Sequence, residues 1–544
     1  MITKKLYIFS FLIAITFSCS NKRADLVVIN SKIYTVDNDN SIANSIAIKD
    51  GKIIEVSNKN LNDFYETKNI FDAEGKTILP GLIDSHCHFY NLGLGQEIIN
   101  LRGTKSLDDI LKILKDYDSK NNSNTIIGRG WDQNDWDDKT FPINDELNKL
   151  FPNKIVVLER VDGHAYFCND YTLKIAGING NTIISGGSII KKNGSPTGVL
   201  VDSPMRMVDK ILPNKTNEEQ VTALKKAEEI CFSYGLTTVD DAGLDKDLIF
   251  LIDSLQKIDD LKIKIYAMVS VSKKNIEFFK KKGKIKTPKL NVRSFKIYGD
   301  GALGSRGAAL KMPYSDDKKN YGKLSTSLED LKYYSQSIFD MGFQMNTHAI
   351  GDSTISFLVK NYNKVLENAI DPRWRIEHAQ VVDKIDFDLF NSKVLPSVQP
   401  THATSDMYWA DERLGHRISG AYAYKDLLDK SKRIALGTDF PVEKVNPFHT
   451  FYSSVERKDL EGYPSSGFQK ENGLTREETL KGMTIWGAFF NFEENEKGSI
   501  EIGKSADFIV INQNIMEIEA DKIPNTKVLK TFLEGEIVYQ NDNL

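Results

Sequence analysis

The chain has 544 residues, a formal net charge of −4, and 27% charged against 40% hydrophobic residues. This length exceeds what one ordinary hydrophobic core supports, so we expect at least two structural units. The slight negative charge argues against nucleic acid as a partner, because phosphate contacts need a basic surface. Four cysteines (Cys19, Cys87, Cys168 and Cys231) lack CxxC pairing, so the sequence indicates neither a disulfide framework nor a thiolate zinc site.

The N-terminus resembles an export signal. Two lysines precede an apolar run over residues 6–17, which is too short to span a bilayer as a helix. Cys19 follows the run as in a bacterial lipobox, where the cysteine is lipidated and becomes the new N-terminus. We therefore predict a signal peptide over residues 1–19 and export to the periplasmic side or the cell surface, with membrane attachment through the Cys19 lipid only. Thr16 and Phe17 depart from the usual lipobox, which leaves ordinary signal-peptidase cleavage as the alternative.

Short β-like segments occupy both ends of the chain after the signal. Those over residues 24–80 include Asp50-Gly51, a dipeptide typical of a two-residue hairpin turn. Those over residues 498–544 turn at Glu534-Gly535. Both ends have the alternating character of half-buried strands. We therefore predict that they form one small β-sandwich, with the catalytic body over residues 81–497 between them.

From about residue 220 to residue 490, short apolar strands alternate with helical stretches. This many β/α units predict an α/β protein with a (β/α)8 TIM-like barrel. Its first strand would end in the segment ILPGLIDSHCHF, residues 78–89. A long insertion, about residues 91–234, separates it from the second strand. The insertion contains a helical run at residues 106–120 and a hairpin at Lys192-Asn193-Gly194.

The segment at residues 78–89 ends with two histidines on one face. Asp84, His86 and His88 lie two residues apart, so in a strand their side chains point to the same side. A lone histidine is most often a hydrogen-bonded core residue. Two histidines at this spacing aim two neutral nitrogens at one point, which is what a divalent metal requires.

Four further polar residues lie at or near the ends of other predicted strands: Lys296, His348, His378 and Asp439. Singly, each has a structural explanation, because an aspartate after a strand usually caps a helix and a lysine in a strand usually extends from a sheet edge. Barrels of this type place their chemistry at the carboxyl ends of the strands. The set, together with the two histidines of the first strand, therefore predicts a metal centre.

These motifs resemble the amidohydrolase superfamily over nearly the whole chain after the signal. The resemblance rests on LPGLIDSHCH, RIEHAQ and LGTDFPV, while GRGWD, DGH, KIYGDGALGSR, HAIGD and SVQPTH look like the amidohydrolase-3 branch that contains N-substituted formamide deformylase. It implies a hydrolase that cleaves a non-peptide carbon–nitrogen bond of a small-molecule amide, in an N-acyl or N-formyl group, through a metal-bound hydroxide.

The resemblance also implies the ligand set. Two divalent ions, most often zinc, would be held by six side chains: His86, His88 and Asp439 on one ion, His348 and His378 on the other, and a carboxylated Lys296 as the bridge. A lysine desolvated in a barrel core loses its proton readily, as carboxylation needs. Asp439 would also take the proton of the attacking hydroxide and deliver it to the leaving nitrogen.

Six other residues are candidates for contact with the substrate. His402, after the seventh barrel strand, is expected to polarise the substrate carbonyl. The others are Trp131, Asp162, His164, Asp300 and Arg306. The insertion residues among them have an alternative role as loop scaffolding, and Arg306 either clamps a carboxylate or holds its loop through a surface ion pair.

Two alternatives to a dinuclear amidohydrolase remain open. A ligand-binding lipoprotein without activity would have the same fold, because fold alone does not determine function, but no member of the ligand set is missing. If Lys296 is not carboxylated, a mononuclear deacylase or deaminase results. The sequence identifies neither the substrate nor the oligomeric state, and a homodimer is compatible with it.

Overall fold

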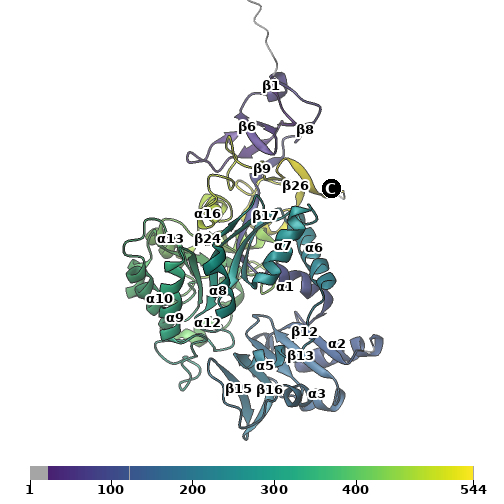
Figure 1. The fold of residues 1–544 in the computed structure, drawn as a ribbon, viewed down its shortest axis with the longest axis vertical. Coiled ribbons are helices and arrows are strands. Elements are labelled where there is room, and N and C mark those ends of the chain that lie inside the picture. Colours follow the sequence, from purple (N-terminus) through teal and green to yellow (C-terminus); the bar gives the residue numbers. More distant parts are fainter. Residues whose placement is uncertain (1–21, 122, 543–544) are drawn as a thin grey trace, which may run out of the picture.

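The structure is a computed structural model that describes residues 22–121 and 123–542 (Figure 1). The predicted signal peptide and Cys19 lie outside the described residues. Within the described part of the chain, no helix has both the length and the apolar character that crossing a membrane requires.

The centre of the molecule is a nearly closed barrel of parallel strands, which confirms the predicted α/β fold. In sheet order these strands are β10 (Leu82–Cys87), β17 (Leu236–Leu244), β18 (Lys264–Ser270), β20 (Leu290–Tyr298), β21 (Gln344–Ala349), β22 (Trp374–His378), β23 (Val394–Val398) and β24 (Ala435–Leu436). Beyond β24, the Asp439 amide donates a hydrogen bond to the His86 carbonyl at 2.8 Å. This contact brings the last strand end against the first.

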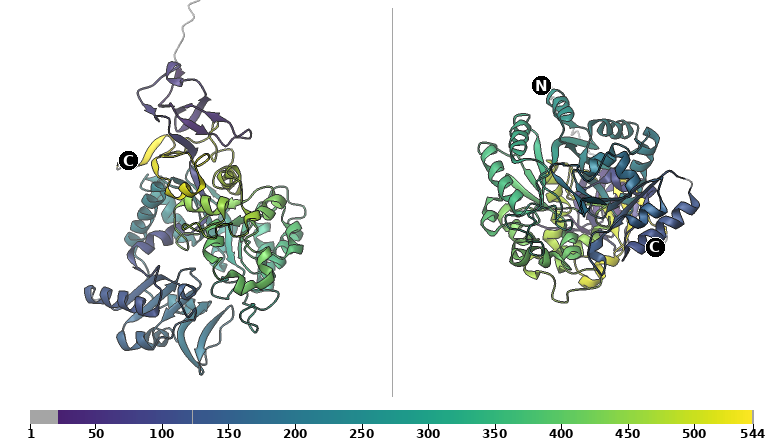
Figure 2. Two further views of the ribbon diagram at one scale, coloured as in Figure 1. Left: turned by 180° about the vertical axis from the view of Figure 1, so that it is seen from behind. Right: turned by 90° about the horizontal axis from the view of Figure 1, so that it is seen from below.

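Helices cover the outside of the barrel (Figure 2). They include α6 (Asn217–Ser233), α7 (Lys246–Lys257), α8 (Lys273–Lys282), α9 (Leu328–Asp340), α10 (Asp352–Val365) and α13 (Tyr424–Ser431). Helix α6 begins with a reciprocal capping box between Thr216 and Glu219, which satisfies the first free backbone N–H groups of the helix. Its buried residues Leu224 and Phe232 belong to the main barrel core.

The segment between β10 and β17 contains a separate mixed sheet. Its strand order is β11 (Ile99–Asn100), β12 (Thr125–Trp131), β13 (Ile155–Arg160), β14 (Ala165–Cys168), β16 (Ser195–Asp202) and β15 (Gly187–Lys192). Helix α2 (Leu107–Lys120) and the short helices α3 (Asp145–Leu150), α4 (Asp170–Ile175) and α5 (Met205–Asp209) accompany this sheet. In Figure 1 this insertion lies at one end of the molecule and the terminal sheets at the other.

The two chain ends meet in a pair of small sheets. One has the order β6 (Lys52–Ser57), β5 (Ser45–Lys49), β2 (Leu26–Ile29), β8 (Ile70–Asp72). The other has the order β27 (Glu536–Gln540), β26 (Val528–Leu533), β25 (Phe508–Ile511), β9 (Thr77–Pro80), β3 (Lys32–Tyr34), β4 (Ile42–Ala43). Residues of both sheets share one apolar core, in which Ile46 and Phe508 are fully buried. Strand β25 pairs with β9, so the C-terminal segment completes a sheet that the N-terminal segment begins.

Candidate functional site

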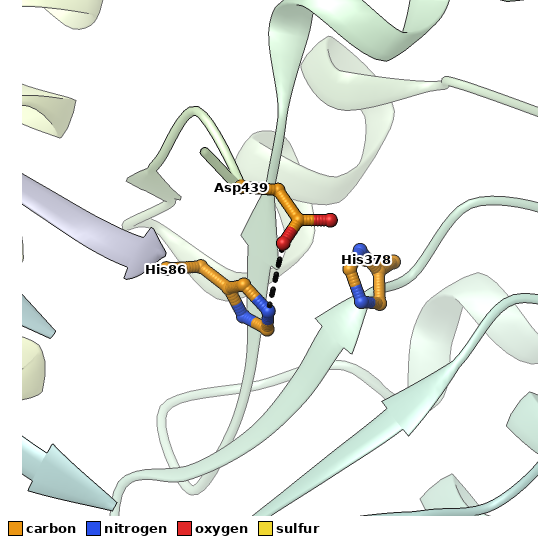
Figure 3. A group of neighbouring side chains, drawn as sticks. All are labelled: His86, His378 and Asp439. Carbon is orange, nitrogen blue, oxygen red and sulfur yellow. Dashed lines mark ion pairs between the residues drawn. The ribbon is translucent and has the colours of Figure 1, made fainter. Parts of the chain in front are cut away.

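Three of the predicted ligands meet at the carboxyl end of the barrel (Figure 3). His86 is on β10, His378 ends β22, and Asp439 follows β24. One ligand atom of each lies within 4.8 Å of the others, and all three side chains are buried. The ion pair drawn in Figure 3 joins His86 Nε2 to Asp439 Oδ1 at 3.7 Å.

The other three predicted ligands surround this group. Lys296 Nζ lies 3.4 Å from His86 Nε2. His88 Nε2 lies 3.4 Å from Asp439 Oδ1. The His348 ring centroid is 4.5 Å from that of His378. All six side chains that the sequence singled out as ligands are thus brought together, from five strands or strand ends.

Backbone geometry explains how His378 enters this group. Strand alternation would point Glu377 and His378 to opposite sides. Glu377 is fully buried and reaches His86, yet His378 also faces the cluster. His378 has a φ of 72°, an uncommon left-handed conformation for a residue with a Cβ, and Asp439 has a φ of 60°. The left-handed turns at the two strand ends direct both side chains to the same place.

Hydrogen bonds orient two of the histidines. Nδ1 of His86 lies 2.5 Å from Glu377 Oε2, and Nδ1 of His378 lies 2.7 Å from Gln399 Oε1. Because each partner accepts a hydrogen bond from Nδ1, the proton lies on Nδ1. The lone pair of Nε2 therefore faces the cluster. Metal-binding histidines are usually held by such a second hydrogen bond. Neither Glu377 nor Gln399 was expected in this role from the sequence.

Burial also favours the protonation states that bind metal. Burial lowers the pKa of His348 and of His378 well below the usual range, so both imidazoles are neutral. Burial likewise lowers the pKa of Lys296. Burial acts to raise the pKa of Asp439, but the contact with His88 and the neighbouring imidazoles outweigh it and hold that pKa well below its usual range. The cluster therefore offers neutral nitrogens and one carboxylate.

Unsatisfied polar atoms support a cation at this place. Among residues 22–121 and 123–542, Asp439 Oδ1 and His402 Nε2 are buried and have no hydrogen-bond partner. Buried polar atoms are nearly always paired, so a carboxylate oxygen left without a donor beside several imidazoles fits a metal ligand. His402 lies in α11 (Pro400–Asp406), just past β23, with Nε2 3.7 Å from Asp439 Oδ2.

A cavity of about 540 Å³ opens over the cluster between the barrel and the insertion. From the barrel, its lining includes five of the candidate ligands and His402; from the insertion, it includes Arg160, Asp162 and His164. This volume suits a small molecule. Two polar groups that the sequence predicted at the pocket wall, Asp162 and His164, are thus on the cavity surface.

The insertion wall is held by ion pairs. The buried Arg160 guanidinium pairs with both Asp132 and Asp162. His164 Nδ1 lies 2.7 Å from Asp202 Oδ1, and the His164 ring centroid is 5.1 Å from that of His348. Burial acts to lower the pKa of His164, but the hydrogen bond and charge of Asp202 raise it to about 9. The insertion therefore places a histidine directly beside a candidate ligand.

Three residues predicted to contact substrate do not line the cavity. Trp131 is fully buried in the apolar core of the insertion. The Asp300 carboxylate accepts hydrogen bonds from three backbone N–H groups, at 2.8–3.0 Å. Arg306 pairs with Asp316 at 2.7 Å, which is the loop-holding role left open for it. The polar groups of Trp131 and Asp300 are used within the fold, which does not favour the expected substrate contact, and Arg306 takes the ion-pair alternative.

Fold and site together define a barrel protein with a buried candidate metal site at the carboxyl ends of its strands. The chain belongs to the amidohydrolase family, whose family model matches residues 69–539. It is 30% identical to the protein LONG AFTER FAR-RED 3 of Arabidopsis thaliana, over 95% of this chain and 92% of that one. It is also 30% identical to the putative amidohydrolase YtcJ of Bacillus subtilis, over 93% and 98%.

More distant similarity points the same way. The chain is 23% identical to N-substituted formamide deformylase of Arthrobacter pascens, over 95% of this chain and 98% of that one. Among solved structures, an uncharacterized metal-dependent hydrolase of Pyrococcus horikoshii OT3 superposes with a TM-score of 0.73 at 26% identity, over 91% of this chain and 99% of that one. Family and neighbours support a hydrolase.

Proposed function

We propose that this protein is a metal-dependent hydrolase that cleaves the carbon–nitrogen bond of a small-molecule amide, of the N-acyl or N-formyl type, rather than a peptide bond. The observation that carries the proposal is the group of His86, His378 and Asp439, which are buried and have ligand atoms within 4.8 Å of one another. His88, His348 and Lys296 lie beside this group, and a cavity of about 540 Å³ opens over it. The similarity to N-substituted formamide deformylase supports the choice of substrate class.

The residues present are of the types that bind divalent metal, and we infer two ions, with zinc as the expected metal. His86, His88 and Asp439 would hold one ion, His348 and His378 the other, and Lys296, carboxylated on Nζ, would bridge them. Such ions, when bound, supply Lewis acidity that lowers the pKa of water to near neutrality. The lowered pKa of Lys296 supports its carboxylation, since only the neutral amine reacts with CO2.

The chain's own groups would handle the proton and the substrate. Asp439 turns Oδ1 toward His86 and His88, while Oδ2 lies 3.7 Å from His402 Nε2. One carboxylate can therefore serve as ligand and as the base that takes a proton from water and passes it to the leaving nitrogen. His402 would donate to the carbonyl oxygen. The products are an amine and a carboxylic acid.

A mononuclear deacylase or deaminase is the second candidate. It is favoured by the fact that the tightest group of ligand atoms contains only His86, His378 and Asp439. Metal content separates the two candidates, because a dinuclear site binds close to two ions per chain and a mononuclear site binds one.

Export of the protein as a lipoprotein anchored through Cys19 is part of the same proposal and rests on the sequence alone.

The test is an activity screen of N-acyl and N-formyl amines against the purified, zinc-supplemented protein, with release of the free amine as the readout. We expect turnover of at least one member of this class. Asp439→Asn should retain part of the metal but lower turnover by roughly 100-fold or more, the effect of losing a general base. Full turnover by Asp439→Asn, or by metal-free protein, would contradict the proposal.

A second variant tests the bridge. Lys296→Ala should lose metal and activity together, because the bridging oxygens are gone. A small carboxylic acid with excess zinc should partly restore both by supplying those oxygens. Two ions per chain in Lys296→Ala would show that the lysine is not a ligand.

A further inference from the structure

Tyr298 is the last residue of β20, two residues after Lys296, and it lines the cavity. Its ring centroid is 5.4 Å from that of His348 and 6.4 Å from that of His164. Lys296 Nζ lies 4.8 Å from the same ring centroid. The phenol is therefore held between the candidate metal ligands of the barrel and a histidine of the insertion.

Within residues 22–121 and 123–542, the Tyr298 hydroxyl has no hydrogen-bond partner. Three fully buried tyrosines differ from this half-buried one, because each has a partner for its hydroxyl. The hydroxyl of Tyr266 donates to Gln344 Oε1 at 2.8 Å, that of Tyr314 to the Ala308 carbonyl at 2.9 Å, and that of Tyr424 to the Gln399 carbonyl at 2.9 Å.

The cavity itself offers the same contrast. Tyr166 also lines it, but its hydroxyl donates to Asp209 Oδ1 at 2.8 Å. Tyr298 is half-buried, so a hydroxyl that the protein leaves unpaired at the cavity surface is available to whatever the cavity contains. Of these two tyrosines at the cavity, Tyr166 has its hydroxyl paired within the protein and Tyr298 does not.

The Tyr298 hydroxyl lies beside a position that has no side chain. It lies at the carboxyl end of β17, where a Cβ added at Gly243 would be 3.9 Å from the hydroxyl oxygen and 3.8 Å from Lys296 Cγ. Gly243 has a φ of +125°, a conformation that other residues rarely adopt, so this position is kept free of a side chain. A tyrosine with an ordinary phenol keeps its proton at neutral pH and acts as a donor.

We propose that Tyr298 is a catalytic residue, whose hydroxyl donates a hydrogen bond to the carbonyl oxygen of the substrate amide and strengthens that bond as negative charge develops there. The proposal rests on the amidohydrolase function proposed above and adds a donor that the sequence analysis did not single out. His164 of the insertion packs against the Tyr298 ring, so under this proposal the insertion helps to position the donor.

The experiment compares Tyr298→Phe with the wild-type protein, both loaded with zinc. Three quantities are measured: kcat and KM on the best substrate of the amide screen, zinc bound per chain, and the Kd of acetohydroxamate by calorimetry. Acetohydroxamate is a metal chelator that presents a carbonyl oxygen. We expect kcat to fall by about 100-fold, the effect of removing one preorganised donor. KM should stay within about twofold, zinc should be unchanged, and the hydroxamate Kd should rise about tenfold.

Tyr266→Phe is the matched control, because it removes a buried hydroxyl of the barrel that is bonded to Gln344 and lies away from the cavity lining. It should lower the melting temperature and leave kcat and the hydroxamate Kd unchanged. If Tyr298→Phe equals the wild type in kcat and in hydroxamate binding, the role of Tyr298 is overturned while the proposed function stands. A fall in kcat that accompanies loss of zinc also overturns it, since Tyr298 would then only support the ligands.

The proposed function and the proposed role of Tyr298 can be rejected independently of each other. If no substrate is found in the screen but the wild-type protein binds acetohydroxamate, the Kd comparison alone decides the role of Tyr298. If the zinc-loaded wild type neither hydrolyses any amide nor binds the hydroxamate, the proposed function is overturned, and the role of Tyr298 with it.

Discussion

At the scale of single residues, the site depends on which nitrogen of each histidine faces the cluster. The carboxylate of Glu377 and the amide oxygen of Gln399 each hold one Nδ1 position, on His86 and His378. A ligand ring whose tautomer and rotation are already fixed loses less entropy when a metal binds. We therefore expect the partners of the histidines to matter for metal affinity almost as much as the histidines themselves.

Glu377→Gln tests this expectation. The amide keeps the shape of the carboxylate but loses its charge, so His86 becomes a weaker ligand. We expect zinc affinity to fall by about 10- to 100-fold, measured by competition with a fluorescent chelator. Glu494→Gln is the control, because Glu494 pairs with Arg373 rather than with a candidate ligand. Equal zinc affinity in Glu377→Gln and wild type would mean that the hydrogen bond does not tune the site.

At the scale of elements, the insertion carries its own core and also supplies part of the cavity wall. Arg160, at the end of β13, has 1% of its side chain exposed and pairs with Asp132 and Asp162. Its guanidinium joins the end of β12 to the turn that carries His164. Two half-buried carboxylates share this one buried cation, so its removal leaves their charge without compensation at the wall of the cavity.

Arg160→Met should destabilise the protein by about 3–5 kcal/mol, the usual cost of breaking a buried ion pair by removing one partner. Urea unfolding followed by fluorescence measures the loss. The matched control is Lys139→Met, which breaks the exposed pair with Glu412 and should cost less than about 1 kcal/mol. Similar stability of the two variants would show that the Arg160 pairs are not needed for the insertion.

Helix α14 (Pro447–Glu456) makes stability depend on pH. Burial lowers the pKa of His449 from an ordinary 6.5 to about 4. Between these values the unfolded chain binds a proton that the folded protein does not, so the free energy of unfolding falls as the pH falls. His449→Gln should weaken this dependence, measured as the change in Tm between pH 7 and pH 4.5. The exposed His416 provides the control His416→Gln, which should retain the wild-type dependence. An unchanged pH dependence in His449→Gln would contradict the assignment.

At the scale of the whole molecule, metal binding should couple the barrel strands. The six candidate ligands come from β10, β20, β21, β22 and the segment after β24, so ions bound there hold the barrel closed. An ion that binds the folded state alone stabilises it by mass action, by about 4 kcal/mol at a thousandfold excess over Kd.

We therefore expect removal of metal with a chelator to lower Tm by several degrees, and excess zinc to restore it. Scanning calorimetry of the protein before and after chelation measures the shift. His348→Ala should reduce the response, because one ion loses half of its histidine ligands. A Tm that does not respond to chelation or to zinc would contradict metal binding at the cluster.

The location of the molecule gives the last prediction. If Cys19 carries lipid, the protein partitions with membranes in detergent-phase separation, and Cys19→Ala releases or misprocesses it. Cys168→Ala, at a buried cysteine of the insertion, is the control and should leave partitioning unchanged. Wild-type protein found wholly soluble outside the cytoplasm would rule out the anchor.

The sequence by itself predicted the barrel and singled out the candidate ligand residues. Strands that alternate with helices are a local pattern, and a polar residue at the end of an apolar strand is visible without knowing its neighbours. Because all parallel strands of a barrel end at one rim, His348 and Asp439 were expected together although 91 positions separate them in the chain.

Only the tertiary structure decided how these residues are held and what else faces the cavity. Glu377 acts on His86 across 291 positions of sequence, and strand alternation gave no sign that His378 would turn inward through a left-handed backbone. The free hydroxyl of Tyr298 has no sequence signal. Whether a hydroxyl lacks a hydrogen-bond partner depends on all the groups that the fold places around it. Trp131 and Asp300 were expected at the substrate, and Arg306 was left between two roles, for a related reason. Their partners lie within the fold, and partners are set by packing rather than by spacing along the chain.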